Sequence, residues 1–129
     1  MRVYFDTNVL VSAFVGHGYT FDVIKDAIYK HDLYYTEFVL EEMQRILTEK
    51  LKLTDEVTLS AVSVVKKYFE RGKTSKTVKK ICRDEKDNQI LADIVENKID
   101  LLMTGDKDLL VLKKYEGIKI IEPKEYWNL

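Results

Sequence analysis

The chain opens with Met1-Arg2-Val3-Tyr4-Phe5-Asp6-Thr7-Asn8-Val9-Leu10, the stretch around which the rest of the sequence is organised. A short apolar run ends abruptly at Asp6, as a buried strand of a parallel sheet does. Apolar residues resume after Asn8 with a spacing that suits a helix. The stretch therefore predicts a strand that places one carboxylate, Asp6, at its C-terminal end, the edge where open α/β sheets bind ligands.

The length and composition describe one globular domain. The 129 residues suffice for a domain with a real core, and we expect a single domain over residues 1–129. Hydrophobic residues make up 46% and charged residues 33%, which excludes a disordered chain. No signal peptide is recognisable, and no apolar run approaches the roughly 18 residues of a membrane helix. We expect a cytoplasmic protein that does not span a membrane.

The charge distribution gives a mixed indication about nucleic acid. The formal net charge is −1, so the overall charge does not recruit RNA or DNA. A basic rim can still coexist with an acidic pocket, and one basic cluster contains Lys66, Lys67, Arg71, Lys73, Lys76, Lys79 and Lys80. Such a cluster is also typical of a solvated helix face and loop. His17 and His31 lack metal-ligand spacing, so no zinc site is expected.

Apolar segments of two kinds alternate along the chain. We expect strands at the run before Asp6 and at 33–35, 77–82, 99–103 and 118–121. We expect helices at 9–14, 21–28 after a cap at Thr20, 36–50, 55–72, 87–96, 109–112 and 123–127. This alternation is typical of βαβ units. It predicts a three-layer α/β/α domain with a mostly parallel central sheet and right-handed crossovers.

Four carboxylates share one position relative to these elements. Asp6, Asp87 and Asp106 each lie at, or just past, the end of an extended apolar segment and at the start of a helix. Glu42 lies one turn into the helix that follows the 33–35 strand. On a doubly wound sheet these positions fall along one edge, so the four carboxylates can converge. Aspartate at a helix start is also an ordinary N-cap, which remains the alternative for each residue alone.

Converging carboxylates indicate a cation. Without basic partners they would repel one another and raise each other's pKa. Oxygen ligands without histidine or cysteine favour Mg²⁺ or Mn²⁺ over zinc. Two such ions, about 3.5–4 Å apart, can activate water and stabilise the leaving oxygen of a phosphodiester. The pattern therefore indicates metal-dependent hydrolysis of phosphodiesters with one or two ions and no side-chain nucleophile.

The chain resembles the PIN-domain ribonucleases, in particular the small single-domain, VapC-like toxins of toxin–antitoxin pairs. The segments that carry the resemblance occur in the order and spacing of that family: Val3–Ala13, Val39–Leu47, Arg83–Asn88, Leu102–Leu110 and Ile118–Tyr126. They cover nearly the whole chain. The resemblance implies a PIN-like fold and a cytoplasmic endoribonuclease that uses Mg²⁺ or Mn²⁺. It also implies a cognate antitoxin as partner and a homodimer.

The resemblance also assigns roles to individual residues. The catalytic, metal-binding acids of the family fall on Asp6, Glu42, Asp87 and Asp106. Glu41 competes with Glu42, which we prefer because the family places this acid directly before a core residue, here Met43. The residues expected to support the acids are Asn8, Thr104, Asp84 and Asp108. The residues expected to contact RNA are Lys86 and Lys107.

Two other functions fit part of the pattern. Asp6–Val9 and Gly105–Asp108 loosely resemble the first and last loops of haloacid-dehalogenase-type phosphatases. Asn8, however, stands where that family needs a second aspartate. The other alternative is a PIN-fold protein that binds a protein partner without catalysis. An aromatic content of 11%, including eight tyrosines, leaves room for such an interface.

Overall fold

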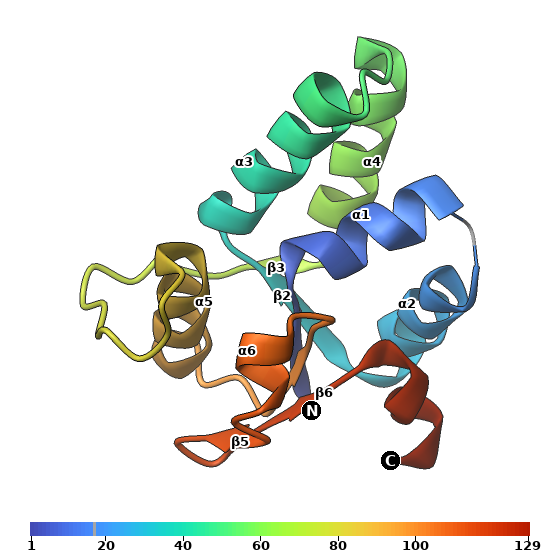
Figure 1. Cartoon of the computed structure of the whole chain (residues 1–129). Helices are drawn as coiled ribbons and strands as arrows, with labels where there is room; N and C mark the ends of the chain where they lie inside the picture. The colour runs from blue at the N-terminus through green and yellow to red at the C-terminus, as the bar shows by residue number, and fades with distance from the viewer. Residues whose placement is uncertain (17) are drawn as a thin grey trace.

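The structure, a computed structural model, describes residues 1–16 and 18–129. Within these residues one six-stranded sheet has the order β3-β2-β1-β4-β6-β5 (Figure 1). The strands are β1 (Arg2–Phe5), β2 (Asp32–Tyr35), β3 (Glu70–Arg71), β4 (Leu101–Met103), β5 (Lys114–Tyr115) and β6 (Ile118–Ile121). Neighbouring strands are parallel except for the antiparallel pair β5 and β6. The predicted mostly parallel sheet is confirmed.

Helices cover both faces of this sheet and complete the predicted three layers. They are α1 (Thr7–Gly16), α2 (Tyr19–Lys30), α3 (Glu37–Arg45), α4 (Asp55–Tyr68), α5 (Glu85–Glu96) and α6 (Lys107–Leu110). A π-helical turn, η1 (Ile46–Lys50), extends α3, and a 3₁₀ helix, η2 (Pro123–Asn128), ends the chain. The chain runs from β1 through β2 to β3 in one direction and returns past β1 to β4 and β6. The helices of the two halves therefore lie on opposite faces.

The reversal of direction occurs between β1 and β4, where the sheet positions the candidate site. The two strands are paired in register, with Tyr4 opposite Leu102 and Phe5 opposite Met103. The ladder continues one residue past the end of β1, because the Asp6 amide donates to the Met103 carbonyl at 2.9 Å. A sheet whose strand order reverses leaves a crevice at the carboxyl ends of the two central strands.

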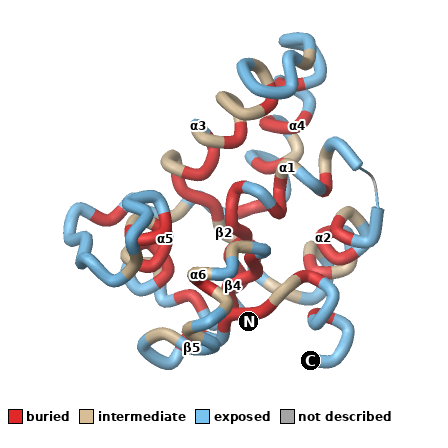
Figure 2. The backbone as a smooth tube through the Cα atoms, in the orientation of Figure 1, coloured by how far each residue is buried: buried red, intermediate tan, exposed pale blue. Residues whose placement is uncertain are grey.

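The core lies along these central strands. Figure 2 shows buried residues concentrated on β2, β4 and the inward faces of the helices, with exposed residues on the outer loops. Val3, Leu101 and Leu102 are at most 1% exposed, because both faces of the central strands are covered. Aliphatic burial of this kind is the main term that stabilises such a sheet. No helix among the described residues is long and apolar enough to cross a membrane.

The predicted strand at 77–82 is wrong. These residues form an irregular loop in which Val78 and Ile81 are each 45% exposed. The buried Asn88 side chain holds the loop, because its Oδ1 accepts the Ile81 and Cys82 amides at 3.0 and 2.6 Å. The edge position next to β2 belongs instead to β3, whose two exposed residues carry no apolar signal.

Several helix boundaries also differ from the prediction: α1 and α5 begin two residues earlier, and α6 (Lys107–Leu110) begins and ends two residues before the predicted 109–112. Thr20 does not cap α2, since it lies buried inside that helix and Gly18 occupies the N-cap position. Helix α4 ends at Tyr68 rather than at position 72, because the chain turns there into β3. The short hairpin strand β5 was not predicted. Of the two histidines that lack metal-ligand spacing in the sequence, His31 is half-buried and His17 lies outside the described residues.

Candidate active site

A cavity of about 160 Å³ lies where β1 ends and holds all four predicted acids. Its walls come from the start of α1, from α3 and η1, from α5 and from the turn before α6. The lining residues are Asp6, Thr7, Asn8, Phe38, Glu42, Ile46, Lys50, Asp84, Lys86, Asp87, Ile90 and Asp106. Five carboxylates thus face two ammonium groups. The structure brings the predicted acids together from segments that are far apart in the sequence.

Asp6 is fixed by hydrogen bonds to both of its carboxylate oxygens. The Thr7 amide donates to Oδ1 and the Thr104 hydroxyl donates to Oδ2, each at 2.7 Å. Thr104 is fully buried, and its Oγ1 also accepts the Asp106 amide at 3.0 Å. Burial raises the pKa of Asp6, and the hydrogen bonds from Thr104 and Thr7 offset part of this effect. The Thr104 hydroxyl therefore connects the Asp6 carboxylate to the backbone of Asp106.

Asp87 is the least compensated acid of the cavity. It lies in the first turn of α5, is 5% exposed, and its Oδ2 has no hydrogen-bond partner within the described residues. Burial is the largest cause that raises the pKa of Asp87 to about 7, and the charges of Asp106 and Asp6 add to it. A buried carboxylate oxygen without a donor is costly unless a cation binds to it.

Asp106 and Asp84 act as helix caps, and for Asp106 this is the alternative that its sequence position left open. The Asp106 carboxylate accepts the Asp108 amide at 2.8 Å, and the Asp84 carboxylate accepts the Lys86 amide at 2.9 Å. Capping does not exclude a second role, because one carboxylate oxygen each of Asp87, Asp106 and Asp108 lies within 4.8 Å of the other two. Asp108 is held by Arg83 through hydrogen bonds of 2.9 and 3.2 Å.

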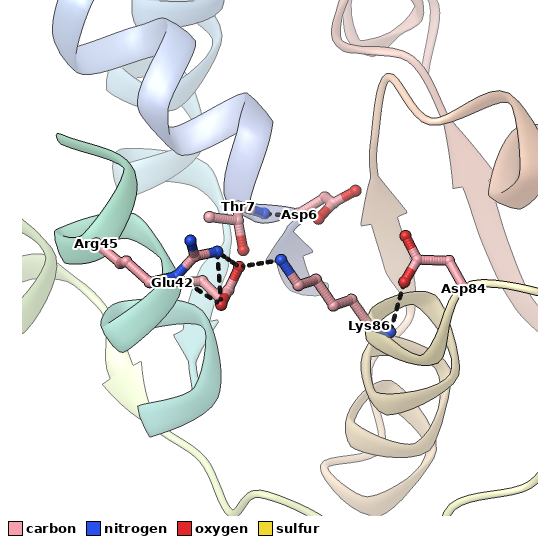
Figure 3. A network of polar contacts seen from close by, with 6 residues as sticks. All are labelled: Asp6, Thr7, Glu42, Arg45, Asp84 and Lys86. Atoms are coloured by element: carbon pink, nitrogen blue, oxygen red, sulfur yellow. Dashed lines mark hydrogen bonds and ion pairs between the residues drawn. The ribbon is translucent and has the colours of Figure 1, made fainter. Parts of the chain in front are cut away.

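Glu42 differs from the aspartates because two cations neutralise it. Arg45 donates from Nε and Nη2 to its carboxylate, with a closest distance of 2.9 Å. Lys86 reaches it across the cavity from α5 at 3.1 Å, as Figure 3 shows. Burial alone would raise the pKa of Glu42, but the hydrogen bonds from Arg45 and Lys86 lower it below its ordinary value. Glu41 is exposed and does not line the cavity.

The remaining predicted residues are only partly in the cavity. Asn8 lines it, but no described residue hydrogen bonds to the Asn8 side chain. Lys86 lies in the cavity wall, whereas Lys107 is exposed outside it. The basic cluster at 66–80 occupies the end of α4, β3 and the following loop, and none of its residues lines the cavity. The assignment of Lys107 to RNA contact stays a prediction.

Sequence reasoning missed two basic residues of the cavity region. Arg45 follows Glu42 by three residues, and this spacing on a helix is a signal for an ion pair that could have found it. Lys50 enters the wall through the π-helical turn η1, which has no recognisable sequence signal. The fully buried Asp93 was missed as well. It accepts the Ser75 amide at 2.6 Å and a Gln89 amide at 2.9 Å, so its role is to hold the loop before α5.

The donor set fits a hard divalent cation. Asp6, Asp87 and Asp106 offer only carboxylate oxygens, the ligands that Mg²⁺ and Mn²⁺ prefer. Among the described residues no lysine or arginine forms an ion pair with any of these three aspartates. Asp87, whose Oδ2 lacks a partner among the described residues, forms with Asp106 and Asp108 a group of carboxylates close enough to share one ion. Binding of a cation would remove the repulsion that raises the pKa of Asp87.

Comparison with known proteins identifies one sequence family. A family model described as PIN domain matches residues 2–108. No curated protein sequence matches the chain.

Solved structures of similar fold cover nearly the whole chain. One is a chain of VapBC2 from Rickettsia felis, solved in complex with a DNA fragment from the VapBC2 promoter. The match covers 93% of this chain and 97% of that chain, with a TM-score of 0.68 and 15% identity. VapC20 of Mycobacterium tuberculosis, a sarcin-ricin loop cleaving toxin, matches 91% and 98%, with a TM-score of 0.63 and 9% identity. The PIN domain endonuclease Utp24 matches 92% and 82%, with a TM-score of 0.59 and 24% identity. At such identities the likeness shows the fold alone.

Proposed function

The chain belongs to the PIN-domain family, and on that premise we propose that it is a metal-dependent endoribonuclease that hydrolyses RNA phosphodiester bonds. One observation carries the proposal: Asp6, Asp87 and Asp106 line one cavity at the strand-order reversal. A carboxylate cluster that binds no cation would be a liability for stability, because each buried charge costs free energy. The family match removes the ground for the alternative of a haloacid-dehalogenase-type phosphatase.

We assign the metal to the three aspartates. Asp6, Asp87 and Asp106 would hold one or two Mg²⁺ or Mn²⁺ ions, with Asp108 and Asp84 beside them. Bound divalent metal supplies Lewis acidity that activates water and neutralises charge on the phosphate and the leaving oxygen. Thr104 keeps Asp6 in place before any ligand binds, because its hydroxyl occupies Oδ2. Glu42 is the fourth acid of the family pattern, and its role as a metal ligand stays a prediction.

A metal titration with a matched nuclease assay tests this function. Mn²⁺ should raise the thermal midpoint of the wild type, since a ligand at 100 times its Kd stabilises by about 2.7 kcal/mol. Asp6→Asn should lose most of this stabilisation. The wild type should cleave RNA with Mn²⁺ or Mg²⁺, whereas Asp106→Asn should not. No stabilisation in the wild type, or cleavage that persists in Asp106→Asn, would contradict the proposal.

We also propose that the protein is the toxin of a toxin–antitoxin pair, acts in the cytoplasm and forms a homodimer. Similarity in fold to VapBC2 and to the toxin VapC20 supports this proposal. Induced expression of the wild type should arrest growth, and Asp106→Asn should relieve the arrest. Light scattering after size-exclusion chromatography should give twice the 15.1 kDa mass of the chain. Normal growth with a high level of soluble wild type would refute the toxin role.

A second candidate function, binding of a protein partner without catalysis, is favoured by one surface. An apolar groove of about 580 Å³ lies between α1, α2 and α4. Val15, Tyr29, Val57 and Tyr68 line it and are each at least 45% exposed. Large exposed apolar groups gathered in one groove are typical of a binding surface. In a protein without catalysis, an apolar segment of a protein partner would occupy this groove. In the toxin proposed above, the occupant would be the antitoxin. The metal titration separates the two functions, since a pure binding module would show no stabilisation by Mn²⁺.

A further inference from the structure

Two cations, Arg45 and Lys86, pair with the Glu42 carboxylate. Glu42 and Lys86 line the acidic cavity, and Arg45 lies beside it on the helix of Glu42. We propose that Arg45 and Lys86, held in place by Glu42, form a subsite that binds a backbone phosphate of a single RNA strand next to the metal-binding aspartates. The proposal rests on the ribonuclease function proposed above. It gives Glu42 the role of a positioning residue whose charge orients the two cations.

The geometry of the three side chains favours this role. Glu42 comes from α3, Arg45 lies one turn further along that helix, and Lys86 comes from α5 on the other side of the cavity (Figure 3). The Arg45–Glu42 and Lys86–Glu42 pairs have closest distances of 2.9 and 3.1 Å. The three charges sum to +1, whereas four aspartates face one lysine among the other residues that line the cavity.

The Glu42 side chain is more buried than the two cationic side chains that pair with it. The Glu42 side chain is 18% exposed, whereas those of Arg45 and Lys86 are 38% and 54% exposed. The carboxylate is thus turned inward and the cations keep donors toward solvent. Arg45 donates to Glu42 only from Nε and Nη2, so Nη1 remains for another acceptor. Lys86 has three donor hydrogens and needs one for Glu42. Such half-exposed ion pairs contribute little to stability, which makes a binding role the better explanation.

The π-helical turn provides a second observation for the same wall. Glu42, Ile46 and Lys50 all line the cavity, at steps of four residues. In a regular α-helix each such step overshoots a full turn by about 40°, so Lys50 would lie about 80° away from Glu42. The wider turn η1 (Ile46–Lys50) reverses this drift in its second step. Lys50 therefore shares the face of Glu42 and extends the line of positive charge. π-Helical turns of this kind occur frequently at functional sites.

A phosphate is the ligand that matches these donors. A guanidinium and an ammonium held by one carboxylate can bind phosphate oxygens with the donors that the carboxylate leaves free. An RNA strand that places its scissile phosphate at the aspartates carries further phosphates in both directions. One of these would lie against Arg45 and Lys86, and contact with Lys50 would fix the direction of the strand. Phosphate contacts position a nucleic acid without reading its sequence.

Binding of a labelled single-stranded RNA, measured by fluorescence anisotropy, tests the subsite. All proteins carry Asp106→Asn and are measured with Mn²⁺ between 50 and 200 mM salt. Lys86→Met and Arg45→Met should each raise the Kd on the order of tenfold and reduce the slope of log K against log salt by about 0.7. Lys30→Met is the matched control, because Lys30 also pairs with an acid at 3.1 Å and is 62% exposed, but on α2. It should leave both quantities unchanged.

The outcomes separate this proposal from the function on which it rests. A wild type that neither binds Mn²⁺ nor cleaves RNA refutes the ribonuclease function. A wild type that cleaves RNA, with Lys86→Met and Arg45→Met binding RNA like Lys30→Met, refutes the subsite alone. If Lys86→Met tightens Mn²⁺ binding and leaves RNA binding unchanged, the Lys86 ammonium occupies the place of the metal ion in the metal-free protein. That result would refute the subsite. Urea unfolding of each variant confirms that the fold is intact.

Discussion

In metal-free protein, replacing Asp87 by asparagine should stabilise the fold most at pH 8, less at pH 5 and little below pH 4. The reason is the environment of this carboxylate. Burial, together with the charges of Asp106 and Asp6, raises the pKa of Asp87 to about 7. A carboxyl whose pKa is higher in the folded than in the unfolded state destabilises the fold wherever it must ionise. Asparagine fills the same volume without the charge.

The size and the pH range of the effect follow from the two pKa values. In the unfolded chain Asp87 titrates near 3.8, so above pH 7 its ionisation in the folded state carries the full cost. At 1.36 kcal/mol per pH unit, the difference corresponds to about 4 kcal/mol, an upper bound because water near the cavity screens the charge. The cost declines as the pH falls from 7 toward 4, where the folded state holds the proton. The wild type should therefore gain stability on acidification over this range.

Urea unfolding in EDTA at pH 5, 6.5 and 8 measures this difference. The free energy of unfolding of Asp87→Asn minus that of the wild type should rise between pH 5 and pH 8. Asp22→Asn, a change of an exposed aspartate on α2, should show no such rise. With saturating Mn²⁺ the order should invert, because only the wild type gains binding free energy. An Asp87→Asn variant that is destabilised equally at pH 5 and pH 8 would refute the reasoning.

Three further substitutions probe single contacts. Thr104→Val removes the hydroxyl that donates to Asp6 at 2.7 Å, so it should cost about 1–3 kcal/mol in urea unfolding and weaken Mn²⁺ binding in calorimetry. Asp93→Ala leaves the buried Ser75 amide unpaired and should cost about 1–3 kcal/mol, with Mn²⁺ affinity unchanged. Glu42→Gln should slow RNA cleavage at least on the order of tenfold, whereas the exposed Glu41→Gln should cleave like the wild type. Equal rates for the last two would contradict the assignment of Glu42 to the cavity.

Local sequence patterns determined the elements with a strong apolar signal. The runs of β1, β4 and β6 and the periodic faces of α3 and α5 depend on neighbours within one segment, and these elements were predicted. The same local patterns put Asp6, Asp87 and Asp106 next to element ends. The pattern failed at 77–82, where Val78 and Ile81 suggested a strand. Whether apolar residues are buried depends on what packs over them, and here both side chains remain 45% exposed.

Two short strands lay beyond any local pattern. The two-residue strands β3 and β5 exist because they lie beside β2 and β6 and complete their backbone hydrogen bonds. Segments of this length carry no periodicity that distinguishes them from a loop. Their identity is decided by the edge that they meet rather than by their own residues.

The sequence by itself thus determined which acids this protein has and at which ends of elements they lie. Only the tertiary structure decided how they differ. Asp87 is left without a partner, Asp6 is held by Thr104, and Glu42 is neutralised by Arg45 and Lys86. The physical reason is that the two properties depend on different distances. Backbone periodicity is set by residues a few positions apart in the sequence. The charge state of a carboxylate is set by groups within a few ångströms, and the fold brings those groups together from distant parts of the chain, as Lys86 of α5 meets Glu42 of α3.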